Sequence, residues 1–191
     1  SIVDASGTNH QLFHAAGLVF CHHNAPIHRV QGLAKRLAEA AKAKDRSRSL
    51  FAYQVLESFD HVGADFDGFR KQRSPTGQPA DLVLEGACAA TVAADLPKLK
   101  SKLPRNKLHA VARGLMQQSG AAPESAGTTK ASRAAVHRDW QNEAIAAVRD
   151  LDDGAGASLD NLKLALGAGN ERVAWMHLAE LWDYVAEEGL R

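Results

Sequence analysis

The sequence predicts an α+β protein: a small sheet covered by helices, followed by a helical domain. Within residues 12–56 the apolar residues follow a strand pattern, then a helix pattern, then a strand pattern again. Nearly everything after residue 80 has helical periodicity. The strongest punctuation in the chain is residues 74–79 (SPTGQP), which lies between the two parts. We therefore expect two domains, at residues 1–80 and 81–191.

The first domain is predicted to contain a strand–helix–strand unit. Residues 12–21 (LFHAAGLVFC) form a nearly continuous apolar run, which is typical of a buried central strand. Pro26 stands where a helix can begin, and residues 28–44 have helical periodicity. The apolar face of this helix is predicted to consist of Val30, Leu33, Leu37 and Ala40 or Ala41. A polar turn at residues 45–48 leads to a second strand at 49–56, so a sheet covered by helices is expected.

The second domain is predicted to be a bundle of helices. They are expected at residues 82–99, at 104–118, from Ser132 through Val148, at 159–166, and over a final amphipathic segment carrying Val173, Met176, Leu181, Trp182 and Val185. Residues 119–130 are small, polar and glycine-containing, which favours a flexible loop. Residues 152–156 (DDGAG) are expected to separate two of the helices.

The composition narrows the function classes. The 191 residues are 45% apolar and 24% charged, which is ordinary for a globular protein, and no apolar run approaches the roughly 18 residues that span a bilayer. We therefore expect a soluble, cytoplasmic protein that does not act at a membrane. The net charge of +1 gives no overall attraction to nucleic acid, so any such contact must come from a local cluster.

Two further features concern the compartment and the extent of the chain. Cys21 and Cys88 both lie in apolar stretches and are expected to be reduced core thiols of a cytoplasmic protein. The chain begins at Ser1 without an initiator Met and soon enters a strand pattern. We interpret it as a piece of a larger protein; a processed N-terminus is the alternative.

Four short segments resemble the large subunit of type III CRISPR effector complexes. Residues 15–26 (AAGLVFCHHNAP) resemble a strand and loop of its palm, where a Ser-Ala-Gly is followed by apolar residues, His, and a Pro that opens a helix. The turn at residues 41–47 (AKAKDRS) is similar to the A-K-x-x-G-R-N turn of the wider diguanylate-cyclase-like superfamily, matched at Lys42 and Arg46. Residues 56–61 (LESFDH) and 103–108 (LPRNKL) are also similar to that CRISPR family.

The resemblance implies a specific fold and chemistry. Residues 1–80 would be the C-terminal part of a ferredoxin-like, GGDEF-type palm, and 81–191 the C-terminal helical domain. In this family the palm joins ATP molecules into cyclic oligoadenylates when the complex holds a target RNA. A GGDD hairpin upstream holds the Mg²⁺ or Mn²⁺, so the metal ligands would lie outside this chain. The partners would be the other subunits of the ribonucleoprotein, the crRNA and the target RNA.

The same resemblance implies roles for three residues. Lys42 and Arg46 would be cations that hold the triphosphate, and Gly17 would let the strand backbone come close to the nucleotide. No catalytic residue and no metal ligand is assigned to this chain. The alternative for Lys42 and Arg46 is a solvated basic helix end, which is favourable beside the negative end of the helix dipole.

The sequence departs from the family pattern at three positions. Ala15 stands where the family usually has Ser, Asn24 where it often has Lys, and Asp45 where the turn has Gly. There is also no GGDD motif in these 191 residues. A catalytically inactive palm, acting as a structural and interaction subunit, is therefore the second hypothesis. A third is a cyclase signalling domain unrelated to CRISPR, against which the helical tail argues.

Other clusters have simpler interpretations. His22, His23 and His28 invite a zinc site, but no Cys or carboxylate with ligand spacing accompanies them. His14 and Cys21 lie seven residues apart on the predicted strand and cannot meet as a nucleophilic pair. The basic run at residues 70–73 (RKQR) is interpreted as a solvated loop, with an RNA-backbone contact as the alternative. The aromatic and Met residues near the C-terminus are interpreted as bundle core, or as core plus a docking surface: Trp175, Met176, Trp182 and Tyr184.

Overall fold

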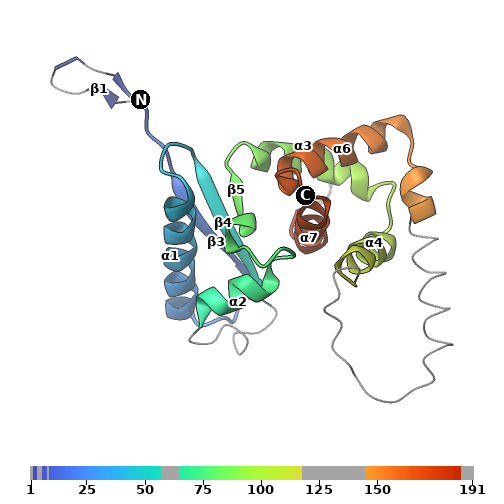
Figure 1. Cartoon of the computed structure of the whole chain (residues 1–191), viewed down its shortest axis with the longest axis horizontal. Helices are drawn as coiled ribbons and strands as arrows, with labels where there is room; N and C mark the ends of the chain where they lie inside the picture. The colour runs from blue at the N-terminus through green and yellow to red at the C-terminus, as the bar shows by residue number, and fades with distance from the viewer. Residues whose placement is uncertain (1, 4–5, 8, 57–64, 118–144, 186–191) are drawn as a thin grey trace. The chain divides into compact units, whose positions relative to one another are not determined.

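The fold is α+β, as predicted, and the chain divides into two compact units. The computed structural model describes residues 2–3, 6–7, 9–56, 65–117 and 145–185 (Figure 1). The first unit comprises residues 1–89 and the second residues 90–191. The division thus follows residue 89, whereas the sequence pattern placed it after residue 80, because a strand beyond that point joins the first unit.

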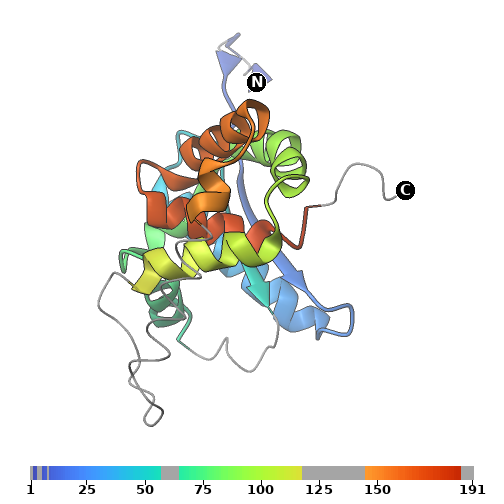
Figure 2. The same cartoon turned by 90° about the vertical axis from the view of Figure 1, so that its right-hand side faces the viewer.

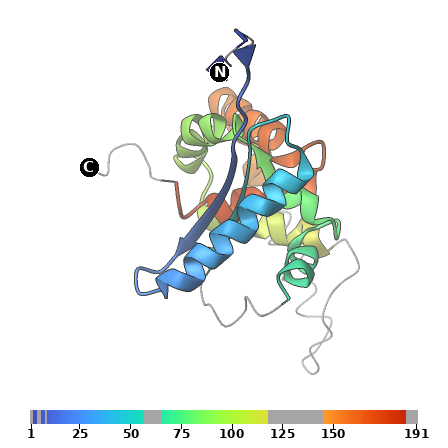
Figure 3. The same cartoon turned by 90° about the vertical axis from the view of Figure 1, so that its left-hand side faces the viewer.

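The first unit is built on the predicted strand–helix–strand unit. Strand β3 (Ala15–Cys21) pairs in parallel with β4 (Leu50–Leu56), and helix α1 (Ile27–Lys44) connects them. Helix α1 lies across one face of the two strands (Figure 3). A short hairpin of β1 (Ile2–Val3) and β2 (Asn9–His10) precedes the sheet.

The hydrophobic core of this unit lies between α1 and the sheet. The predicted apolar face of α1 is buried at Leu33, Leu37 and Ala41. The buried residues packed with them are Leu50, Ala52, Leu56, Phe66 and Val83, with Val19 and Cys21 at the margin. These strand residues alternate along β3 and β4 because successive side chains point to opposite faces of a sheet.

Among the described strands β3 lies at one edge of the sheet, whereas the sequence pattern predicted a buried central strand. The strand order is β3–β4–β5, with the short β5 (Val83–Glu85) antiparallel to β4. Because β3 pairs with only one strand among the described residues, it is more exposed than β4, and Leu18 keeps 44% of its surface accessible. An apolar run fits a central strand and an exposed edge strand equally, so its composition could not decide between them.

Residues 82–99 do not form one helix, in contrast to the prediction. A 3₁₀ turn (Pro79–Leu82) and β5 occupy the beginning, and helix α3 (Cys88–Lys100) starts only afterwards. Lys44, at the end of α1, donates hydrogen bonds to the carbonyl oxygens of Ala80 (2.9 Å) and Val83 (2.8 Å). This tertiary contact holds the 3₁₀ turn and β5 against the α1–β4 unit. The helix propensity of residues 82–99 alone could not predict it.

Glycine 17 sets how closely α1 approaches β3. A Cβ placed on Gly17 would lie 2.0 Å from the carbonyl oxygen of Ala34 and 2.8 Å from the amide nitrogen of Ala38. Both of these atoms belong to the backbone of α1, which cannot move aside as a flexible side chain would. Only glycine therefore fits at this strand position, and it lets the helix lie directly on the strand.

The described residues of the second unit form helices, as predicted. Helices α3, α4 (Arg105–Gln117), α6 (Asp153–Gly167) and α7 (Glu171–Leu181) form it, with α7 packed against α4 and α6 (Figure 2). Trp175, Met176 and Trp182 are buried, which confirms their interpretation as core, whereas Tyr184 is exposed. The predicted loop at residues 119–130 and most of the helix predicted from Ser132 lie outside the described residues.

The predicted break between two helices lies at residues 150–152 and not at 152–156, because residues 153–156 already belong to α6. The side chain of Asp152 accepts a hydrogen bond from the Ala155 amide (2.8 Å), so Asp152 is the N-cap of α6. The glycines at 154 and 156 are tolerated because the capped first turn supplies the hydrogen bonds that a helix start otherwise lacks. Capping outweighs the low helix propensity of glycine here.

A buried carboxylate ties α3 to α6. Asp95 of α3 accepts hydrogen bonds from Lys98 Nζ (3.0 Å), Ser158 Oγ (3.1 Å) and Asn161 Nδ2 (3.2 Å). A buried carboxylate is tolerated when several donors satisfy it, as here. These bonds fix the register of the two helices more specifically than their apolar contacts alone.

We expect Gly17→Ala to lower the free energy of unfolding by about 3 kcal/mol, because the added methyl group collides with backbone atoms of α1. Gly32→Ala is the matched control: the same substitution within α1, with no atom within 4 Å of the new Cβ, is expected to stabilise by about 0.5–1 kcal/mol. Urea unfolding followed by far-UV circular dichroism measures both. Equal effects of the two substitutions would contradict the close packing of α1 on β3.

Candidate anion-binding site

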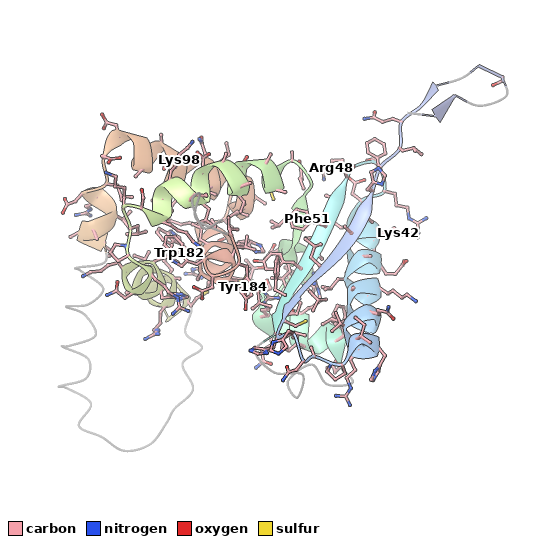
Figure 4. All side chains as sticks on the ribbon, turned by 180° about the vertical axis from the view of Figure 1, so that it is seen from behind. Lys42, Arg48, Phe51, Lys98, Trp182 and Tyr184 are labelled. Carbon is pink, nitrogen blue, oxygen red and sulfur yellow. The ribbon has the colours of Figure 1, made fainter. Side chains whose placement is uncertain are left out.

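The predicted phosphate-binding residues Lys42 and Arg46 line the same pocket. The pocket has a volume of about 310 Å³ and lies where α1 ends and strands β3 and β4 begin. Lys42 and Arg48 mark this end of the unit in Figure 4. The pocket is lined by Phe13, His14, Ala15, Ala38, Glu39, Lys42, Asp45, Arg46 and Arg48.

The close contact at Gly17 explains why the strand and the helix share this pocket. Since α1 lies directly on β3 at Ala34 and Ala38, the next turn of the helix carries Lys42 to the start of the strand, beside Ala15. The side of Gly17 that lacks a Cβ faces the helix backbone. Gly17 thus allows the helix to pack closely on the strand. It does not line the pocket, although the resemblance implied that it would let the strand backbone approach a nucleotide.

A hydrogen-bonded turn presents Arg46 and Arg48. One carboxylate oxygen of Asp45 accepts from the Ser47 amide (2.8 Å) and from Ser47 Oγ (2.6 Å), and the other accepts from Arg48 Nε (2.8 Å). The backbone of Asp45 is extended, with φ −163°, so this position does not need glycine. The side-chain hydrogen bonds of Asp45 hold the turn instead.

The same contacts determine the ionisation of Asp45. Hydrogen bonds from the Ser47 hydroxyl, the Ser47 amide and Arg48, in that order of size, lower the pKa of Asp45 to about 2. Its carboxylate is therefore ionised at neutral pH, but its lone pairs are already engaged. An incoming anion meets a carboxylate that is largely compensated by its own donors.

The sequence reasoning missed Arg48. Its guanidinium contacts both Asp45 and Glu85 of β5, and about half of its side chain is exposed. The only sequence signal was its place two residues after Arg46 in the same turn, because its bond to Glu85 crosses 37 residues of chain. An arginine has five N–H donors, so Arg48 can hold these carboxylates and still donate to a ligand.

His14 is the second pocket residue that the sequence did not indicate. Its amide donates to Ser49 Oγ (3.3 Å), and its carbonyl oxygen accepts from the Leu50 amide (2.8 Å). These bonds extend the β3–β4 pairing by one residue, so the backbone leading into β3 is fixed at the pocket wall. His14 was considered only as a partner for Cys21, which it does not meet.

Three cations and two carboxylates line the pocket. Lys42, Arg46 and Arg48 supply the positive charges and Glu39 and Asp45 the negative ones, while Glu85, outside the lining, also pairs with Arg48. Glu39 lies 3.6 Å from Lys42 on an exposed helix surface, a pair of little energetic weight. Arg46 makes no ion pair with any described residue, so at least its charge is available. Cations of this number around one concavity suit a phosphate chain.

The basic run at residues 70–73 belongs to helix α2 (Phe66–Arg73) and not to a loop, and half of it is structural. Arg70 is only 1% exposed, stacks on the Phe66 ring, and donates to the carbonyl oxygen of Pro79. Burial lowers its pKa to about 10. Arg73 donates to Gln54 Oε1 (2.7 Å) and stacks on Tyr53. Arg70 therefore ties α2 to the 3₁₀ turn at Pro79 and Arg73 ties it to β4, so these two side chains do not form a solvated face.

A second pocket, of about 390 Å³, lies in the helical unit. Its charged residues are Asp95, Lys98, Lys102 and Asp152, which form two ion pairs: Asp95 with Lys98, and Asp152 with Lys102. Asp95 and Asp152 are also engaged by the α3–α6 bonds and the α6 cap. With its charges balanced and its acids in structural use, this pocket offers a weaker anion site than the one at Lys42.

Among the described residues no group of three or more His, Cys, Asp or Glu side chains is placed to hold a metal ion. The rings of His22 and His23 lie next to each other, with centroids 4.7 Å apart and planes tilted by 41°. Cys21 and Cys88 are free thiols; Cys88 is buried, and burial raises its pKa to about 11, so it is unreactive. Within the described part of the chain, no helix has the length and apolar character needed to cross a bilayer.

Comparison with known proteins returns no relative. No protein-family model, no curated protein and no solved structure matches this chain. The functional argument therefore depends on the geometry of the pocket and on the resemblance of the short motifs.

We expect the Asp45 carboxyl to titrate with a midpoint near pH 2, and both Ser47→Ala and Arg48→Ala to raise this pKa, because each substitution removes a side-chain donor to the carboxylate. Since the folded pKa lies below the unfolded value of about 3.9, the stabilisation from this turn is present above that pH. It is lost as the pH falls through 2. Carboxyl ¹³C chemical shifts measured against pH test this, and a midpoint near 4 in the wild type would refute the turn.

Proposed function

We propose that this chain is the C-terminal part of the large subunit of a type III CRISPR effector complex, and that its first unit belongs to an ATP-binding palm. The observation that carries the proposal is the convergence of Lys42 and Arg46 on one pocket. These are the two residues that the turn motif assigns to the triphosphate. The parallel β3–α1–β4 order in which the turn lies is also the order that the family pattern requires.

The open edge of β3 supports the view that this sheet is part of a larger, ferredoxin-like palm. Seven residues of β3 pair with β4, while no described strand pairs with its other edge. Exposed edge strands are usually protected by a charged residue, a proline or a bulge, and β3 (AAGLVFC) has neither a charge nor a proline. Further palm strands beside β3 would satisfy this edge and complete the sheet.

In the proposed reaction a ribose hydroxyl attacks the α-phosphorus of ATP, forming a new phosphodiester bond as pyrophosphate leaves. Lys42 and Arg46 hold the phosphate chain and offset the charge that develops on it. The metal ion would supply Lewis-acid stabilisation of the displacement, and its GGDD ligands would lie upstream of these residues. The described residues fit the phosphate half of such a site, because they place three cations around one pocket.

The helical unit is assigned to assembly. In this proposal it docks against the small and backbone subunits alongside the crRNA–target duplex, in the cytoplasm where such complexes act. The unit is well suited to a rigid docking element, because polar bonds at Asp95 as well as apolar packing hold its helices in register.

A palm without catalytic activity is the second candidate, favoured by one specific observation. Ala15 lines the pocket at the position where the family usually has Ser, so a hydroxyl that could hydrogen-bond a phosphate is missing from the wall. In that case the first unit would be a structural element of the same RNA-guided complex. Activity of the assembled complex distinguishes the two candidates.

The test uses the full-length parent protein, assembled with its guide RNA and partner subunits and incubated with ATP, Mg²⁺ and target RNA. We expect cyclic oligoadenylates by mass spectrometry, falling at least about a hundredfold when Lys42→Ala and Arg46→Ala are combined. The matched control is Arg29→Ala with Lys35→Ala, which removes two exposed cations of α1 that do not line the pocket. A wild-type complex that binds target RNA but yields no product would refute the cyclase and favour the inactive palm.

A further inference from the structure

An exposed aromatic ring lies at the wall of the anion pocket, and neither the sequence motifs nor the proposed phosphate contacts use it. Phe13 lines the pocket together with the three cations, and 40% of its surface is accessible. Covering an exposed apolar ring removes its surface from water, which is favourable. A flat aromatic or apolar group of a ligand could cover this one.

The ring is attached to a fixed part of the backbone. The adjacent residue, His14, is held by Ser49 through its amide and by Leu50 through its carbonyl oxygen. The regular pairing of β3 with β4 begins directly afterwards, at Ala15 and Leu50. Phe13 is therefore one residue away from an ordered strand, and a ring held in this way loses little conformational entropy when a ligand stacks on it.

The pocket divides into an apolar wall and a cationic wall. Phe13, Ala15 and Ala38 are apolar, and the two alanines leave open the space that larger side chains would fill. Lys42, Arg46 and Arg48 carry the positive charge. A ligand that matches both walls has a flat, weakly polar ring joined to a chain of negative charges. A nucleotide has this form, whereas inorganic phosphate matches only the cations.

We propose that Phe13 is the base-stacking residue of this pocket, so that a nucleoside triphosphate binds with its base on the Phe13 ring and its phosphates on Lys42, Arg46 and Arg48. The inference rests on the proposed function, since it assumes that the pocket takes a nucleotide, and adds to it the subsite for the base. Stacking on one aromatic face tolerates every base, so Phe13 contributes affinity and orientation without selecting adenine.

The test compares two ligands that differ only in having a nucleoside. The full chain is titrated with ATP and, separately, with inorganic tripolyphosphate, both with Mg²⁺ at low ionic strength, and amide chemical shifts give the dissociation constants. Phe13→Ala is expected to weaken ATP binding about tenfold and to change tripolyphosphate binding less than twofold. Phe13→Tyr, which keeps the ring, should bind ATP as the wild type does. Leu12→Ala is the matched control, because Leu12 is a neighbouring, half-exposed apolar residue outside the pocket.

The outcomes separate this inference from the proposed function. If the Lys42→Ala, Arg46→Ala double variant loses both ligands while Phe13→Ala binds ATP normally, the phosphate site stands and the base subsite is refuted. If Phe13→Ala weakens both ligands equally, the ring only supports the fold of the pocket, which also overturns the inference. If the wild type binds neither ligand, or binds an RNA oligonucleotide through these residues but not ATP, both the nucleotide site and the base subsite fail.

Discussion

The contact between Gly17 and the backbone of α1 is the constraint on which the first unit depends. It brings the helix within van der Waals distance of β3, so that Leu33, Leu37 and Ala41 fill the space against β4. It also carries Lys42 to the start of β3, where the strand supplies Phe13 and His14. Core packing and the anion pocket thus share one origin, and a side chain at position 17 would disturb both.

Charged residues near the pocket divide into those that build it and those that remain available. Lys44 points to the carbonyl oxygens of Ala80 and Val83, and burial, the largest influence, lowers its pKa. Asp45 organises the turn, and Arg48 joins that turn to β5 through Glu85. Lys42 and Arg46 have fewer such contacts, and Arg48 keeps N–H donors that its two carboxylate contacts do not use. Within residues 42–48 the fold thus combines a structural cation, Lys44, with three exposed cations that line the pocket.

The helical unit shows the same use of polar groups for specificity. Asp95 is buried among donors from α3 and α6, and Lys100 reaches the carbonyl oxygen of Val185 while its ammonium lies over the Trp182 ring. Such contacts can be made in one helix register only, whereas apolar contacts between leucines tolerate sliding. A bundle with a fixed register presents a constant surface.

The sequence by itself determined the α+β class, the strand–helix–strand unit, the buried face of α1 and the burial of Trp175 and Trp182. It also indicated that Lys42 and Arg46 lie close together at the end of α1. These follow from local periodicity and spacing, which a single segment contains in full. Only the tertiary structure decided that β3 is an edge strand, that Gly17 serves helix packing, that residues 83–85 form a strand, and that Phe13, His14 and Arg48 join the pocket. Each of these depends on a neighbour that is remote in the chain, such as Ala34 for Gly17 or Glu85 for Arg48, and no local pattern encodes which remote residues will meet.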